Sequence, residues 1–203
     1  MHKLLFLVFS LPLVVNFCGD DKYFEAFEYE FFTGKVSGGK YFSQTDTIWI
    51  IAEASAYTIG EDSGDSVLID DPMFFRDPSF TLVRLIPPTS GVNSEWAIDE
   101  FEIIVKAGEI EFPECRSSFI TYYAGFDEEE KRFFINIGLI PKRVGKYLIS
   151  MNNINFTNEV QINELFNDYI LVDNPQRVEW VRCERTNRIN MKNPEGKHFF
   201  RVR

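Results

Sequence analysis

The feature that most constrains the fold is the stretch 133–149, in which a strand pattern, a corner and a second strand pattern follow one another. Between Phe133 and Ile140 the residues at every second position are apolar and would all lie on one face of a β-strand. A corner containing Pro141 follows, and a Gly-x-Tyr sequence ending at Tyr147 opens a second apolar run. The stretch therefore predicts two strands joined by a corner, in a chain built from sheets.

This arrangement resembles the E–F corner of immunoglobulin-like sandwiches, in which a tyrosine near the start of strand F hydrogen-bonds back across the corner. The resemblance assigns that role to Tyr147 and implies a sandwich of two antiparallel sheets. The alternative is an unrelated corner between two strands, whose tyrosine only packs in the core.

Further strand patterns lie on both sides of the corner. Aromatic residues alternate with glutamates near the start of the chain, which predicts a half-buried strand at about 26–36. The run 47–54 is apolar on nearly both faces and rich in β-branched residues, which is typical of a central strand. Shorter or alternating apolar runs predict further strands at 67–69, 80–86, 101–106, 119–126, 133–140 and 198–202.

Polar stretches separate these strands. Residues 127–131 are all charged and lie between two strand patterns, which predicts a hairpin with a solvated turn. The stretch 57–65 is rich in Gly, Ser, Asp and Glu, and 184–197 is polar, so we expect both to be loops. Pro87 and Pro88 are expected to end the strand at 80–86.

One segment has a helical pattern instead. Its apolar residues recur at i, i+3, i+4, i+7 and i+8, which places them on one helix face: Ile162, Leu165, Phe166, Tyr169 and Ile170. We therefore predict one all-β domain at 26–203, an immunoglobulin-like antiparallel β-sandwich with a short helical insertion near the C-terminus, at about 152–195. The 21 Phe, 8 Tyr and 3 Trp residues support a substantial core rather than a disordered chain.

The first residues have the pattern of an export signal. Lys3 precedes an apolar run from Leu4 to Val15, which is too short to span a bilayer that needs roughly 20 apolar residues. We therefore interpret residues 1–17 as a signal peptide. The alternative is a buried helix of the domain.

The apolar run leads to Cys18, with Val15 three positions before it, and this resembles a bacterial lipoprotein signal. The resemblance implies that Cys18 is acylated and becomes the mature N-terminus. Residues 18–25 then form an acidic tether similar to the surface-export tag of some Bacteroidota lipoproteins, or a solvated spacer without a specific role. Ordinary secretion is the rival interpretation, but small residues in an Ala-x-Ala pattern are missing between Val15 and Tyr29.

The charge and the cysteine content limit which classes of partner and which redox compartment suit the chain. The chain has a formal charge of −10, so it should repel nucleic acid and anionic lipid, whereas cations or basic partners would be attracted. If Cys18 is lipidated, Cys115 and Cys183 are left as a candidate disulfide in an oxidising compartment. The alternative is two separate buried thiols.

The sequence contains no recognisable catalytic motif. His198 is the only histidine after residue 17, and we interpret it as a surface residue rather than a catalytic one. A pair of carboxylates could in principle hydrolyse glycosidic bonds, but the sequence favours no pair over another. We therefore expect a non-enzymatic protein without a cofactor.

Two weaker candidates for binding remain. Acidic residues gather around one polar stretch and could hold calcium, which takes oxygen ligands: Glu61, Asp62, Asp65, Asp70 and Asp71. A solvated acidic loop explains them equally well. Trp96 follows a polar, Gly-containing stretch and could form part of a sugar-binding platform or pack at the edge of the core.

These observations predict a lipid-anchored protein of the outer membrane, on its periplasmic face or at the cell surface. Its domain would act as an accessory, adhesion or ligand-binding module whose partner is a protein or a glycan. The alternatives are a polysaccharide-binding lipoprotein that assists an outer-membrane importer and a carboxylate-dependent hydrolase. The sequence does not indicate the oligomeric state.

Overall fold

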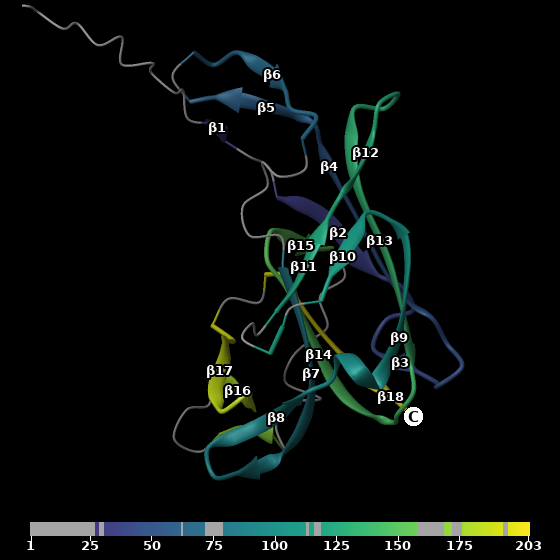
Figure 1. Cartoon of the computed structure of the whole chain (residues 1–203), viewed down its shortest axis with the longest axis vertical. Helices are drawn as coiled ribbons and strands as arrows, with labels where there is room; N and C mark the ends of the chain where they lie inside the picture. The colour runs from purple at the N-terminus through teal and green to yellow at the C-terminus, as the bar shows by residue number, and fades with distance from the viewer. Residues whose placement is uncertain are drawn as a thin grey trace, which may run out of the picture.

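The computed structural model describes residues 27–28, 31–61, 63–71, 79–112, 114–115, 119–157, 169–171, 176–192 and 195–203. These residues are almost entirely β-structure, arranged as two large sheets packed into a sandwich with two smaller sheets attached (Figure 1). The predicted β-sandwich is therefore confirmed. The predicted signal peptide, the tether and Cys18 lie outside the described residues.

The first large sheet runs in the order β12-β13-β4-β2-β15, with β9 also paired to β13. Its strands are β12 (Gly125–Asp127), β13 (Arg132–Pro141), β4 (Ile48–Ser55), β2 (Phe32–Val36), β15 (Ile154–Phe156) and β9 (Phe101–Ala107). The β4 strand is central, as expected for 47–54, because β2 and β13 pair with its two edges.

The second large sheet runs in the order β10-β11-β7-β14-β18-β3, with β8 also paired to β7. Its strands are β10 (Glu109–Glu111), β11 (Ile120–Tyr123), β7 (Ser79–Thr89), β14 (Gly145–Met151), β18 (Lys197–Val202), β3 (Tyr41–Phe42) and β8 (Val92–Trp96). Both β18–β3 and β15–β2 are parallel pairs, so the sandwich is antiparallel except at these two edges.

The strand order within the sheets is immunoglobulin-like. The order β2-β4-β13-β9 corresponds to strands A, B, E and D, and β7-β14-β18 corresponds to C, F and G. The β8 strand extends the second sheet beside β7, where variable-type domains add a strand. The E–F corner is therefore the connection from β13 to β14.

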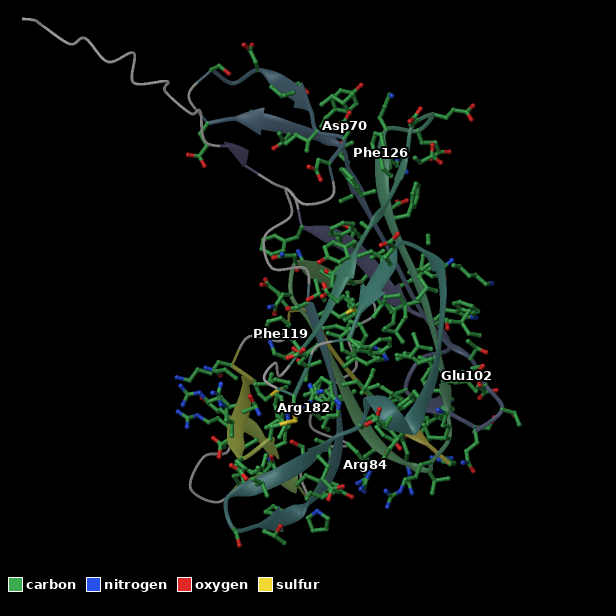
Figure 2. All side chains as sticks on the ribbon, in the orientation of Figure 1. Asp70, Arg84, Glu102, Phe119, Phe126 and Arg182 are labelled. Carbon is green, nitrogen blue, oxygen red and sulfur yellow. A yellow bond between two sulfur atoms is a disulfide. The ribbon has the colours of Figure 1, made fainter. Side chains whose placement is uncertain are left out.

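The core lies between the two large sheets, whose inward side chains are aromatic or aliphatic (Figure 2). Tyr147 is completely buried, and its ring packs edge-to-face on Phe101 with ring centroids 4.9 Å apart. Its hydroxyl oxygen lies 2.9 Å from the carbonyl oxygen of Arg143 and 2.8 Å from Glu100 Oε2, and either can accept its proton. The predicted role of Tyr147 at the corner is thus confirmed, with Glu100 as an additional partner.

Glu100 belongs to a short 3-10 helix, η2 (Ile98–Glu100), that precedes β9. The Arg84 Nε and Arg143 Nη1 groups each donate to Glu100 Oε1 at 3.0 Å, and Arg84 also pairs with Glu95. Burial and the neighbouring Glu100 carboxylate raise the pKa of Tyr147 well above its usual value. The tyrosine therefore stays protonated and joins β14 to η2 and to the corner.

The two smaller sheets correct the sequence predictions. The stretch 57–65, expected to be a loop, contains β5 (Tyr57–Gly60), which pairs with β1 (Phe27–Glu28) and β6 (Ser66–Leu68). The polar stretch 184–197 was also expected to be a loop. It contains β17 (Arg185–Asn190), which forms a hairpin with β16 (Arg177–Arg182).

The strand predicted at 80–86 is longer in the structure than the sequence suggested. The β7 strand continues through Pro87 and Pro88, at the point where its pairing with β8 shifts register, because prolines fit a β-sheet where ladder hydrogen bonds are interrupted. Most of the predicted helical segment, 158–168, lies outside the described residues. The described residues near it form β15, β16 and β17.

Candidate functional site

The β16–β17 hairpin lies against the outer face of the second large sheet (Figure 1). Two buried polar side chains of β8 hold it there. Asn93 Nδ2 donates to the carbonyl oxygens of Tyr169 and Arg177 at 2.8 and 3.0 Å, and Asn93 Oδ1 accepts from the Glu179 N–H at 2.7 Å. Ser94 Oγ donates to the Glu179 carbonyl oxygen at 2.9 Å. These side chains therefore satisfy backbone groups along the edge of β16.

A second apolar core forms beneath the hairpin. Val83, Leu148 and Phe199 are direct cross-strand neighbours on β7, β14 and β18, and all three are buried. Val178 and Trp180 of β16 cover this row from the hairpin side. The outer face of the sheet is therefore apolar where the hairpin packs on it.

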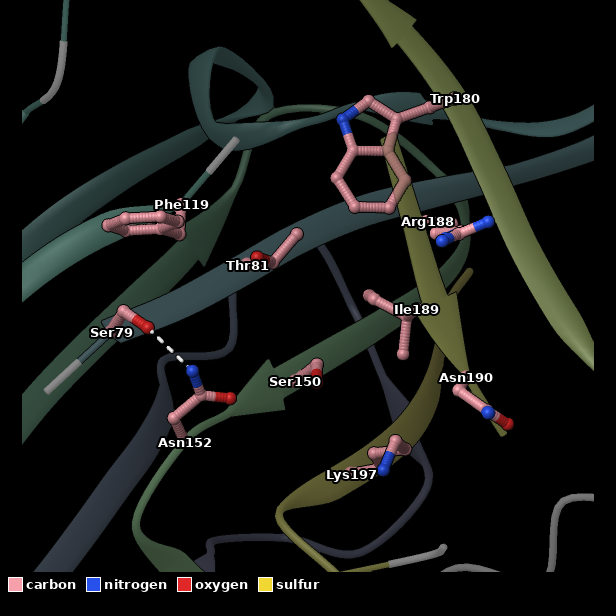
Figure 3. Close-up of a pocket in the computed structure, with 10 residues that line it drawn as sticks. All are labelled: Ser79, Thr81, Phe119, Ser150, Asn152, Trp180, Arg188, Ile189, Asn190 and Lys197. Carbon is pink, nitrogen blue, oxygen red and sulfur yellow. Dashed lines mark hydrogen bonds between the residues drawn. The ribbon is translucent and has the colours of Figure 1, made fainter. Parts of the chain in front are cut away.

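Two residues further along each strand, the same face becomes polar. Thr81, Ser150 and Lys197 are again direct cross-strand neighbours, so their side chains project side by side from the sheet. This polar row forms the base of a cavity of about 300 Å³ that opens where the apolar row ends (Figure 3). The cavity is the candidate site.

One wall of the cavity comes from the edge of the sheet. Ser79 begins β7, and its Oγ lies 3.0 Å from Asn152 Nδ2, which donates to it. Phe119, just before β11, lies on the same side of the cavity (Figure 3). This wall offers a hydroxyl, an amide and an exposed aromatic ring.

The opposite wall belongs to the hairpin. Trp180 is 1% exposed, and Arg188, Ile189 and Asn190 follow one another along β17. The indole Nε1 of Trp180 has no hydrogen-bond acceptor among the described residues. In Figure 3 this nitrogen lies on the side of the ring toward Phe119. A buried donor left without an acceptor is costly.

Lys197 is half-buried, and its Nζ donates to the Glu195 carbonyl oxygen at 3.2 Å. Burial lowers the pKa of Lys197 below its ordinary value of 10.5, and the nearby Glu195 carboxylate partly opposes the change. Lys197 and Arg188 are the charged residues among the described lining residues, and both are cationic. The described lining thus combines two cations with hydroxyls, amides and aromatic rings.

Comparison with protein-family models, curated proteins and solved structures finds no match to this chain. The site therefore has to be interpreted from its own geometry.

A disulfide joins the loop of the hairpin to the chain that precedes β11 in sequence. Cys115 and Cys183 are bonded, with Cα atoms 5.8 Å apart and a sequence separation of 68. Cys183 and Glu184 form the two-residue hairpin loop, and both have positive φ angles, of 52° and 64°. Because non-glycine residues adopt this conformation at a cost, the covalent link holds a turn that the local sequence disfavours.

Trp96 lies near the hairpin rather than in the cavity. It ends β8, is partly buried between the two apolar cores, and has the Arg182 guanidinium 4.0 Å from its ring centroid. One ring face is therefore occupied by a cation–π contact. The predicted platform role of Trp96 stays a hypothesis without support from this arrangement.

Among the calcium candidates that the structure describes, no group of ligands comes together. Asp62 lies outside the described residues, and within the described part of the chain no three His, Cys, Asp or Glu side chains come together as metal ligands. Asp65 instead takes part in the β5–β6 turn, where its N–H donates to Ser63 Oγ at 3.0 Å.

His198 corrects a sequence interpretation. It was expected at the surface but is completely buried, with Nε2 3.1 Å from the Gly39 carbonyl oxygen and its ring against Phe156 and Phe200. It is therefore part of the packing near β3. The described residues also contain no helix that is long and apolar enough to cross a membrane.

Proposed function

We propose that this chain is a lipid-anchored protein of the cell envelope whose sandwich domain is a non-enzymatic ligand-binding module. The cavity between the second sheet and the β16–β17 hairpin is its binding site. The observation that carries this proposal is the row Thr81, Ser150 and Lys197, which opens into a cavity of about 300 Å³ instead of being covered. Small-ligand sites are typically concave and about 300–1,000 Å³ in volume, and this cavity lies at the lower end of that range.

The chemistry of the lining favours a ligand with many hydroxyl groups. Ser79, Thr81 and Ser150 can each donate or accept a hydrogen bond, and Asn152 and Asn190 can do both through separate atoms. Phe119, whose ring is exposed, adds apolar surface on which a sugar ring can rest. A polysaccharide-binding lipoprotein that delivers glycans to an importer is therefore the specific form of the proposal that we favour.

Hydrolysis is less well supported. A glycosidase needs two carboxyl groups on either side of the bond that breaks. The described lining of the cavity contains no Asp or Glu side chain. We therefore propose binding rather than cleavage.

Filling the cavity should abolish binding without unfolding the domain. We expect the variant Ser150→Trp to lose binding to a panel of neutral and acidic oligosaccharides on an array, because the indole would occupy the space above the polar row. The matched control is Thr186→Trp, since Thr186 is exposed on the hairpin and does not line the cavity. Circular dichroism checks the fold of both. Equal binding by Ser150→Trp and the wild type would contradict the proposed site.

Replacing the acylated residue should release the protein from the membrane. We expect the wild type in the membrane fraction of expressing cells and the variant Cys18→Ala in the soluble fraction, because acyl chains anchor by burying methylene groups at about 0.8 kcal/mol each. An Asp20→Asn, Asp21→Asn variant keeps the anchor and serves as the control. If wild type and Cys18→Ala are both soluble, the anchor is contradicted. If the wild type is in the membrane fraction, protease treatment of intact cells distinguishes a surface protein from a periplasmic one.

A further inference from the structure

The described lining of the cavity is positively charged although the chain as a whole is acidic. The full chain has a formal charge of −10, yet Arg188 and Lys197 are the two charged residues in the described lining. Partial burial of Lys197 is unfavourable because a charged group loses hydration when it leaves water, and Glu195 offsets only part of that cost. The net negative charge can keep the chain soluble, but it does not explain why the described lining of this cavity is cationic.

The charge extends over the hairpin. Residues 176–192 contain five basic and two acidic side chains, a formal charge of +3. Figure 2 shows nitrogen atoms gathered on the outward side of this hairpin. Arg185 and Lys192 are exposed and do not line the cavity, so they add to the field around it without filling it. Such a local field attracts anions to the opening and steers them there.

The partners of the other basic residues help to define the site. Arg177 pairs with Glu179 at 3.4 Å, and the Arg182 guanidinium stacks on Trp96. Arg188 instead lies at the exposed edge of the cavity, beside Asn190 and Ile189 (Figure 3). Lys197 stands on the opposite, sheet side. Both side chains line the same cavity, so an anionic group bound there lies near a guanidinium and an ammonium group.

We propose that the cavity binds an anionic saccharide, with a carboxylate or sulfate group of the sugar placed between Arg188 and Lys197. The proposal rests on the cavity being the ligand site proposed above. The hydroxyls of Thr81 and Ser150 and the amides of Asn152 and Asn190 then bind the sugar hydroxyls. The cationic, hydroxyl and amide groups together favour a charged sugar, because an inorganic anion would not contact the amides, the hydroxyls and the aromatic rings.

The pH dependence of binding follows from the protonation of Lys197. A bound anion favours the charged ammonium form, so affinity is greatest below the pKa of Lys197 and falls as the pH rises through it. Burial lowers this pKa, so the loss begins below the ordinary lysine value of 10.5. Affinity should also fall with rising salt, because ions screen the attraction between exposed charges.

The test compares an oligogalacturonate with the same oligosaccharide after methyl esterification, which removes the charge and keeps the sugar. Binding is measured by isothermal titration calorimetry with the soluble Cys18→Ala protein, starting at residue 18. Sodium sulfate serves as the control anion that carries no sugar. We expect the oligogalacturonate to bind at least about tenfold more tightly than its ester and than sulfate. A ratio of this size corresponds to the free energy of about one charge-assisted hydrogen bond.

Two variants assign the effect to the cavity. Arg188→Gln should weaken oligogalacturonate binding about tenfold and Lys197→Met by at least as much, with little change for the ester. Arg188 is exposed, so its variant is not expected to affect folding. Arg185→Gln removes the same charge from the same hairpin outside the cavity and should change affinity less than about threefold.

The outcomes separate the two proposals. Equal binding of the acid and its ester, unaffected by Arg188→Gln, would overturn the anionic class and leave saccharide binding standing. Equal binding of sulfate and oligogalacturonate would overturn the sugar part of the inference. If neither oligosaccharide binds and the array of neutral and acidic glycans is also empty, the proposed function and this inference both fail.

Discussion

The variant Asn93→Ala is expected to lower the free energy of unfolding by about 2–4 kcal/mol, because it removes three hydrogen bonds and leaves buried backbone groups without partners. Asn93 is completely buried between β8 and β16. Alanine can neither donate to the carbonyl oxygens of Tyr169 and Arg177 nor accept from the Glu179 N–H. Urea unfolding followed by tryptophan fluorescence measures the change.

The neighbouring residue provides the matched control. Ser94 is also buried but makes one hydrogen bond to the hairpin, so Ser94→Ala should cost about 1 kcal/mol. The two variants should also differ in hydrogen exchange, with the β16 amides losing protection first in Asn93→Ala. If both variants unfold with the same free energy and β16 keeps its protection, Asn93 does not hold the hairpin.

Removing the disulfide is expected to have the other large effect. The double variant Cys115→Ser, Cys183→Ser should be about 4 kcal/mol less stable than the oxidised wild type. The reason is that the bond closes a long loop, between cysteines with a sequence separation of 68. The bond joins the hairpin to the segment that leads into Phe119. Its loss should therefore weaken saccharide binding as well as stability.

Reduction of the wild type separates the bond from the substitutions. In excess dithiothreitol, wild type and double variant should unfold at the same urea concentration, whereas without it only the wild type should be stabilised. A double variant as stable as the oxidised wild type would show that the disulfide contributes nothing to folding. Normal oligosaccharide affinity in that variant would show that the hairpin keeps its position without the bond.

The sandwich could be predicted because its strands follow local rules. The stretch 133–149 showed both the alternation of β13 and the corner that places Tyr147, and the apolar run at 47–54 indicated a central strand. Those patterns depend on residues that are close in sequence. The role of Glu100 at the same corner depends on β9 lying beside β13, which the local sequence does not specify.

The β16–β17 hairpin was missed for a local reason. Its loop consists of Cys183 and Glu184 at positive φ, where Asn-Gly or Asp-Gly is the usual signal. The β17 strand is also mostly polar, because one of its faces is exposed and its inner face packs through Ile189. Val178 and Trp180 of β16 are buried, but the sequence near them gives no sign of the strand with which they pair.

The candidate site could not be predicted because it is assembled by strand register. Thr81, Ser150 and Lys197 are far apart in sequence and become neighbours only through the pairing of β7, β14 and β18. Serine and threonine within strands are common, so each residue alone is uninformative. The available signal was a lysine just before the apolar pair Phe199 and Phe200, together with Ser150 between the apolar residues Ile149 and Met151.

The central claim, that the cavity over the polar row is the binding site, is tested most directly by titrating the isotope-labelled protein with oligogalacturonate and following amide chemical shifts. We predict that the largest changes occur at Thr81, Ser150, Arg188 and Lys197 and at the indole N–H of Trp180, in line with their positions around the cavity. Changes centred on Trp96 or on the β1–β5–β6 sheet, or no changes at all, would contradict the claim.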